Sequence, residues 1–280
     1  MYFDSEKNII EMFQSTTKAE NILLMSETKI EEQIANELLS PEFWKTWTDS
    51  SGKSDPPPDF FSDESRMMMD VMRVDDTTHR NKKGNRFNPE RIAERNMGKE
   101  IEASGILKAC PNVKNTMCIA AFDDERNFLK HDFGWYRESF KTVLKSHDGK
   151  IKNYNKNHAG YKTIFFVCDE STEYLMTKTC LDRINSKNGV VSGFPHFFWD
   201  DEYFLSIVKS LQADAVVWYT PFKKAKYIAE DFSIKTSEQP KVVVIDVNAL
   251  KNDKKKHGDY PIAKMVSVEL KGANYEDNEA

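Results

Sequence analysis

The sequence is poor in cysteine and lacks the spacings by which cysteine and histidine hold zinc. Its 280 residues contain four cysteines, and none of them forms a C-x-x-C pair. Those in apolar runs, Cys118 and Cys168, read as small hydrophobic residues. His131, His147 and His158 show no zinc-ligand spacing to one another or to cysteine. We therefore expect reduced thiols, no structural zinc and a cytoplasmic location.

Long hydrophobic runs and nucleotide-binding motifs are also missing. No segment reaches the ~18 apolar residues of a membrane span, and the acidic start MYFDSEKN does not resemble a signal peptide. The chain has no G-x-G-x-x-G, P-loop or G-x-S-x-G motif. Its net charge is −5, so a site for a polyanion has to be a local basic patch. We expect no membrane partner.

What the chain does contain is an alternation of apolar strands and amphipathic helices. With 39% hydrophobic and 12% aromatic residues, it has the material for a substantial core. The patterns predict strands at 66–74, 116–122, 163–168, 215–220, 241–247 and 265–270. They predict helical structure over 5–39 (with a helix start near Ser26), 89–107, 135–146, 174–184 and 201–211. This order predicts an α/β fold with a mixed central sheet flanked by helices.

Composition along the chain suggests three parts. Residues 1–50 are expected to form an N-terminal helical segment packed on the core. Residues 51–272 are expected to form the α/β domain, and the polar residues 273–280 a frayed tail.

Two carboxylates stand out in the segment DPPPDFFSDESRMMMDVMRVDD, residues 55–76. The run Pro56–Pro58 stiffens the backbone before Asp59. A polar turn then leads into a strand that carries Asp70 in its middle. We expect the two carboxyl groups to converge on one metal site, since they can share one ion if the strand leading from Asp59 pairs with the strand of Asp70.

Asp70 needs a partner in its apolar strand. A period of two places it on one face with Met68 and Met72, and an unpaired buried carboxylate is costly. A divalent cation, which prefers carboxylate oxygens, would compensate for this cost. An ion pair with Arg73 or Lys82 is the alternative.

This arrangement resembles the PD-(D/E)xK, or restriction-endonuclease-like, superfamily. Pro58-Asp59 matches the first half of its motif and Asp70-Val71-Met72 the second. The resemblance implies a restriction-endonuclease-like core in which Asp59 and Asp70 bind Mg²⁺ for phosphodiester hydrolysis. It also implies a supporting glutamate from the preceding helix, for which Glu32 is the best match and Glu31 the next.

The chain departs from the motif at its lysine, because Met72 occupies that position. Lys82, Lys83 or Lys99 would have to replace it, with Lys82 as the catalytic choice. Arg73 would point to the opposite face of the strand unless a bulge re-aims it. The alternative is structural: Asp59 caps a turn after the prolines and Asp70 pairs with a basic residue.

A literal E-x-K sequence occurs near the end of the chain. Glu269-Leu270-Lys271 follows Asp259 by ten residues. Too little sequence follows it for the helix and strand that normally complete such a site.

Acidic residues also follow two of the apolar strands. They are Asp123, Asp124 and Glu125 after the strand at 116–122, and Asp169 and Glu170 after the strand at 163–168. Sites in open α/β sheets gather beyond the carboxyl ends of the strands, so these groups could ligate Mg²⁺. The alternative is that they cap the helices that follow.

Basic residues concentrate in two segments. The first contains Arg80, Lys82, Lys83, Arg86, Arg91, Arg95 and Lys99; the second contains Lys141, Lys145, Lys150, Lys152, Lys156 and Lys162, with Tyr154, His158 and Tyr161 between them. Such patches could bind phosphates, and we expect Arg80, Lys83, Arg86, Arg91 and Arg95 to contact nucleic acid. The alternative is that both segments are solvated surface.

Together these features favour a Mg²⁺-dependent nuclease, or a nuclease-like protein that binds nucleic acid. The competing hypothesis is a catalytically inactive α/β scaffold for a protein partner, because Met72 replaces the motif lysine. The sequence does not specify an oligomeric state.

Overall fold

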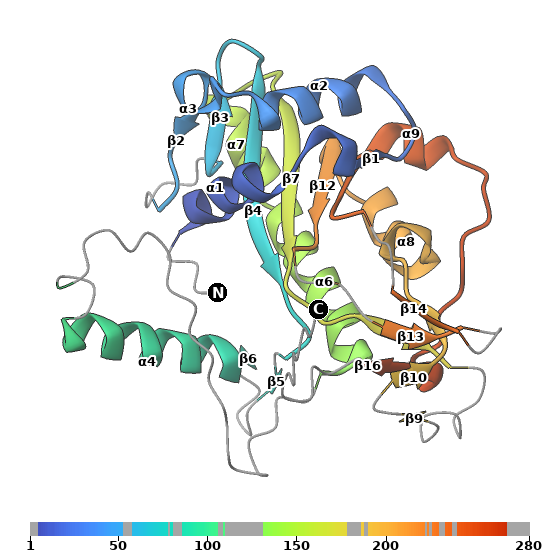
Figure 1. Cartoon of the computed structure of the whole chain (residues 1–280). Coiled ribbons are helices and arrows are strands. Elements are labelled where there is room, and N and C mark those ends of the chain that lie inside the picture. Colours follow the sequence, from blue (N-terminus) through green and yellow to red (C-terminus); the bar gives the residue numbers. More distant parts are fainter. Residues whose placement is uncertain are drawn as a thin grey trace.

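The computed structural model describes residues 5–52, 58–77, 79–80, 86–105, 109, 131–177, 186–187, 190–221, 223, 226–229, 233–236 and 240–267. Its centre is a seven-stranded mixed sheet with the order β1-β15-β12-β7-β4-β3-β2 (Figure 1). These strands are β1 (Ile22–Leu24), β2 (Thr48–Asp49), β3 (Phe60–Ser62), β4 (Met67–Val74), β7 (Lys162–Asp169), β12 (Ala215–Tyr219) and β15 (Val242–Asp246). The predicted α/β fold with a mixed, helix-flanked sheet is thus confirmed.

The middle of the sheet is parallel and its flanks are mixed. Strands β4, β7 and β12 run parallel to one another, whereas β3 is antiparallel to β4 and β15 is antiparallel to β12. The predicted strands at 66–74, 163–168 and 215–220 therefore form its centre. The predicted strand at 116–122 lies outside the described residues.

Helices cover both faces of this sheet (Figure 1). One face packs on α1 (Glu6–Thr16), α2 (Lys29–Leu39) and α3 (Phe43–Thr46), and the other on α6 (Phe133–Asp148), α7 (Ile151–Asn157), α8 (Glu202–Lys209) and α9 (Val247–Asn252). Each layer encloses its own apolar core. Burial on both faces explains why the central strands are continuously hydrophobic.

Strand β4 is the most informative of these strands for function. All of its side chains are buried except that of Arg73. Met67 and Met69 pack in the core beneath α1 and α2, while Met68 and Met72 pack beneath α6 and α7. The alternation places Asp70 on the α6 and α7 side, as the strand period predicts.

Two helix predictions were wrong in part. The segment 5–39 forms two helices with the 3₁₀ turn Ala19–Asn21 and β1 between them, because hydrophobic spacing alone does not reveal a short strand. Its second helix begins at Lys29, after a capping box made by Thr28 and Glu31. Residues predicted to begin a helix at Tyr174 instead form β8 (Tyr174–Met176), which pairs with two other strands.

Smaller sheets and one further helix complete the described structure. The sheets are β11-β8-β16, β14-β13-β10-β9 and β5-β6. Their other strands are β5 (His79–Arg80), β6 (Arg86–Phe87), β9 (Ser186–Lys187), β10 (Val190–Ser192), β11 (Phe194–Pro195), β13 (Lys226–Ile228), β14 (Ile234–Thr236) and β16 (Met265–Ser267). Helix α4 (Pro89–Ser104) begins at Pro89, as predicted. Among the described residues, no helix has the length and apolar character required to cross a membrane.

The capping glutamate of α2 is fully buried and gives a test of the fold. Glu31 accepts backbone hydrogen bonds from Ser26 (3.0 Å), Thr28 (3.2 Å) and Asp246 (2.8 Å), so it ties α2 to β15. We expect Glu31→Gln to lower the free energy of unfolding by about 2 kcal/mol, because a buried donor loses its acceptor. The matched change Glu32→Gln, at an exposed position, should cost less than about 0.5 kcal/mol. Urea unfolding measures both, and equal losses would contradict the buried role of Glu31.

Candidate functional site

Asp59 and Asp70 lie opposite each other on neighbouring strands. The ladder of β3 and β4 pairs Phe60 with Met69 and Phe61 with Met68, so its continuation pairs Asp59 with Asp70. Each carboxyl group perturbs the pKa of the other, so the two groups lie close together. The close approach that a shared site requires is therefore present in the structure.

The backbone around Asp59 is held in place. The Val71 amide donates to the Asp59 Oδ2 atom at 2.7 Å. The buried Ser50 hydroxyl donates to the carbonyl of Pro58 at 2.6 Å, and the Ser50 amide donates to that of Asp59 at 2.8 Å. The carboxyl group thus bonds across the hairpin rather than capping a turn.

The pKa values of the two carboxyl groups are shifted in opposite directions. Burial, and then the negative charge of Asp70, raise the pKa of Asp59 to about 8. Burial also acts to raise the pKa of Asp70, but the interactions with His147, Asp59 and Tyr154 together outweigh it and hold that pKa below its usual value. Asp59 therefore holds its proton at neutral pH, whereas Asp70 is ionised.

Two residues that the motif did not indicate complete this site. His147 Nδ1 lies 2.6 Å from the Asp70 Oδ2 atom, and the Tyr154 hydroxyl donates to the same oxygen at 2.8 Å. Burial, followed by the nearby Asp70 charge, raises the pKa of Tyr154. A helical signal was available for His147, because it lies three residues after Leu144 and seven after Phe140, both on the buried face of α6.

The structure describes some of the other predicted members of the site, and these lie away from the carboxyl pair or are buried in the core. Glu32 is exposed on α2, and α2 covers the opposite face of the sheet from Asp70. Met72 is buried in the core beneath α6 and α7. Arg73 pairs with Glu170 at 2.6 Å rather than with Asp70. Lys82, the expected lysine replacement, lies outside the described residues.

The first basic segment is described only in part. Arg80 lies on β5, Arg86 on β6, and Arg91 and Arg95 on α4. The side chains of Arg95 and Lys99 are exposed. Lys83 lies outside the described residues, as do Glu269 and Lys271 of the terminal E-x-K sequence and the acidic residues at 123–125.

The donor set at Asp59 and Asp70 suits a hard cation that keeps some of its water. Within the described ranges, no group of three or more His, Cys, Asp or Glu side chains is arranged to hold a metal ion. Mg²⁺ commonly binds through one or two carboxylates and completes its shell with water and substrate phosphate. Two adjacent carboxyl groups fit that mode of binding.

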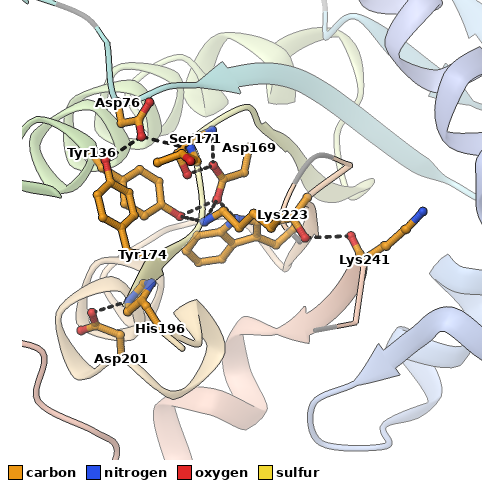
Figure 2. Close-up of polar contacts among 12 residues, drawn as sticks. Asp76, Tyr136, Asp169, Ser171, Tyr174, His196, Asp201, Lys223 and Lys241 are labelled. Atoms are coloured by element: carbon orange, nitrogen blue, oxygen red, sulfur yellow. Dashed lines mark hydrogen bonds and ion pairs between the residues drawn. The ribbon is translucent and has the colours of Figure 1, made fainter. Parts of the chain in front are cut away.

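A second polar cluster lies at the carboxyl end of β7. Figure 2 shows Asp169 between Tyr136 and Lys223. Its Oδ2 atom accepts hydrogen bonds from the Tyr136 hydroxyl, the Trp218 indole (2.9 Å) and Lys223 Nζ (3.1 Å), and its Oδ1 atom accepts two from Ser171. Five donors therefore surround one fully buried carboxylate.

Neighbouring carboxylates are held in a similar way. Asp76 accepts from the Tyr174 hydroxyl at 2.6 Å and the Thr172 amide at 3.1 Å, and lies 2.9 Å from His131 Nδ1. His196 Nε2 lies 2.9 Å from Asp201.

The prediction that Asp169 and Glu170 cap a following helix was wrong, because β8 follows them. The hydrogen bonds of these carboxylates instead connect loops at the carboxyl end of β7 in the central sheet.

The buried ion pair between Asp169 and Lys223 should supply most of what this polar cluster contributes to the stability of the fold. We expect Lys223→Met to reduce the free energy of unfolding by about 3–5 kcal/mol, because Asp169 would remain buried without its cation. Lys162→Met is a matched control: its pair with Asp214 has the same 3.1 Å distance, but the lysine side chain is 53% exposed. That change should cost about 1 kcal/mol or less. Similar losses in urea unfolding would contradict a special role for the buried pair.

The raised pKa of Asp59 predicts a pH dependence of stability. Between the ordinary carboxyl pKa and about 8, the native state holds a proton that the unfolded chain has lost. Unfolding should therefore become easier as pH rises from 5 to 8, by at most about 1.4 kcal/mol per pH unit. In EDTA, Asp59→Asn should remove this decline, whereas Glu64→Gln at an exposed position should retain it. Urea midpoints measured at each pH would contradict the prediction if Asp59→Asn followed the wild type.

Comparison with known proteins assigns no function to this chain, so a functional proposal has to rest on the geometry of the site. No family model, curated protein or solved structure matches this chain. The paired carboxyl groups of Asp59 and Asp70, with His147 and Tyr154 behind them, form the candidate functional site.

Proposed function

We propose that this protein is a divalent-cation-dependent nuclease of the restriction-endonuclease-like kind. The observation that supports this most directly is the pairing of Asp59 with Asp70 across β3 and β4. Burial and the adjacent negative charge of Asp70 raise the pKa of Asp59 to about 8, so that this carboxyl group holds a proton at neutral pH. A divalent cation would replace that proton and balance both charges.

The order of the described elements supports this proposal in part. An antiparallel hairpin, β3 and β4, has Asp59 directly before its first strand and Asp70 in its second. Strands β5 and β6 and helix α4 follow along the chain, and helices α6 and α7 then lead to β7, which runs parallel to β4. The resemblance seen in the sequence implies a helix after the Asp70 strand and then the strand at 116–122, which lies outside the described residues.

Asp59 and Asp70 would hold the cation. When bound, it would lower the pKa of the attacking water and stabilise the leaving oxygen. Tyr154 fixes the orientation of the Asp70 carboxylate, and the Val71 amide fixes that of Asp59. The protein thus presents its two oxygen donors in a preset geometry.

His147 is the residue we assign to the role of the missing lysine. Its Nδ1 atom faces Asp70, which orients the ring. Only in its neutral form, with the ring proton on Nδ1, can His147 accept a proton from the attacking water at Nε2. The side chain is 22% exposed, so a substrate can reach its edge.

A catalytically inactive scaffold is the second candidate. Met72, at the position of the motif lysine, is only 3% exposed and packs in the core. A protein that had lost catalysis could keep this residue for packing alone. Cation binding without cleavage would favour this candidate.

The proposal predicts a cation-dependent increase in thermal stability. Mn²⁺ or Mg²⁺ should raise the melting temperature by several degrees at saturating concentration, since a ligand that binds the native state stabilises it. The shift should grow between pH 6 and pH 8.5, because the cation competes with the proton on Asp59. Asp70→Asn should abolish the shift, and Glu64→Gln should retain it. No shift at pH 8.5, or an unchanged shift in Asp70→Asn, would exclude the site.

Cleavage of a labelled oligonucleotide tests the catalytic part. With Mn²⁺ present, wild type should cut the strand and Asp70→Asn should be at least about a hundredfold slower. His147→Gln should lose rate by about 10²–10⁴ while it keeps the thermal shift. A His147→Gln protein with unchanged rate would remove this residue from the mechanism.

A further inference from the structure

The charge of this chain is distributed unevenly, and the basic part lies beside the proposed site. Residues 141–162 contain six lysines against one aspartate, a local formal charge of +5 in a chain of −5. Among these lysines, Lys145, Lys152, Lys156 and Lys162 are exposed. Because the chain as a whole is acidic, polyanions should concentrate at its basic segments, of which this one lies beside the proposed site.

Partly exposed aromatic rings accompany the lysines. The ring of His158 lies 4.4 Å from that of Phe61 and 5.2 Å from that of Tyr161, between centroids, and is tilted against both. Arg66 lies over Tyr161 at 5.8 Å. Phe61, His158 and Tyr161 are all partly exposed, and Phe61 and Tyr161 are anchored against the core. We call these three rings with Arg66, Lys152 and Lys156 the α7 platform.

The α7 platform is continuous with the carboxylate pair. Helix α7 directs Tyr154 inward to Asp70 and carries exposed Lys152 and Lys156 on its outer side. On the hairpin, Phe61 follows Asp59 by two residues, so both side chains point to the same face of the strand. Two residues of extended chain span about 7 Å, which places the rings next to the proposed site.

We infer that the α7 platform binds single-stranded nucleic acid and leads it toward Asp59 and Asp70. Exposed aromatic faces stack on unpaired bases, while lysines beside them contact the phosphates. In a duplex, bases are already stacked and cannot lie on these rings. The inference rests on the proposed function for the direction of the strand, although binding itself requires no cation.

Acidic groups limit where the strand can pass. Asp63 accepts a hydrogen bond from the Tyr161 hydroxyl at 2.6 Å, and Asp214 pairs with Lys162 at 3.1 Å. Exposed Glu64 lies next to Asp63, and Asp148 follows His147. The path with fewest like charges therefore runs along the outer side of α7, over Lys152 and Lys156.

Fluorescence anisotropy in EDTA tests this binding with three labelled probes. They are oligo(dT) of 15 nucleotides, oligo(U) of the same length and a mixed-sequence duplex of 15 base pairs. The single strands should bind more tightly than the duplex at 50 mM salt, and the comparison of dT with U decides between DNA and RNA. Absent binding of both single strands, or equal or tighter binding of the duplex, would overturn the inference.

Substitutions distinguish what the lysines contribute to binding from what the aromatic rings contribute. Lys152→Gln/Lys156→Gln should reduce the salt-dependence slope by about 1.4, because two phosphate contacts are lost from a single strand. His158→Ala should weaken binding roughly tenfold, as expected for one lost stacking contact. The control Lys254→Gln/Lys256→Gln removes the same charge from another exposed segment and should change neither slope nor affinity by a comparable amount. Losses as large in the control would overturn the inference.

Failure of this inference is distinguishable from failure of the proposed function. Asp70→Asn should still bind oligo(dT) in EDTA, while its cation-dependent thermal shift is lost. Photocrosslinking of 5-iodouracil-substituted oligo(dT) to the wild type gives an independent measurement, because it does not depend on how a variant folds. Crosslinks should map to His158, Tyr161 or Phe61. Crosslinks confined to other parts of the chain would overturn the inference whatever the outcome for the cation.

Discussion

The buried ion pair between Asp169 and Lys223 is the interaction on which the middle of the structure depends. A carboxylate with no exposed surface is tolerated only because five donors surround it, one of which is the Lys223 cation. Those donors come from α6, β12 and the segments after β7 and β12, so one charge joins elements that are far apart in sequence. Tyr136 also stacks on Tyr174, which holds Asp76 at the end of β4. The carboxyl ends of the three parallel strands are therefore tied together by polar contacts rather than by apolar packing alone.

The carboxyl pair of Asp59 and Asp70 differs from this cluster in its balance of charge. Asp169 has an excess of donors, whereas Asp70 faces a second carboxyl group as well as His147 and Tyr154. Groups that serve only structure are usually satisfied, and strongly perturbed carboxyl groups concentrate at functional sites. The two clusters are separated by four residues along β4 and β7, about 13 Å. Strand β4 can therefore be anchored by polar contacts at its end and still carry, in its middle, a carboxylate that faces a second carboxyl group.

Helix α7 connects the chemistry of the carboxyl pair with the surface of the protein. Its seven residues place Tyr154 against Asp70 and leave Lys152 and Lys156 in solvent. This division follows from the helical period, which turns positions two residues apart to different sides. A short helix can thus orient a buried carboxylate and also present cations to a ligand. On this side a polyanion would meet a local excess of lysines.

Hydrophobic patterning by itself determined the class of this fold and the positions of its central strands. The strand period also determined the face on which Asp70 lies, but that the two carboxyl groups approach each other depended on the pairing of β3 with β4. What only the tertiary structure decided are the partners: His147 and Tyr154 lie 77 and 84 residues from Asp70. Glu32 looked suited to the site, but α2 packs on the other face of the sheet, and the neighbouring Glu31 is buried as a cap. The physical reason is that periodicity depends on neighbours along the chain, whereas hydrogen-bond partners and the face that a helix covers depend on how distant elements pack.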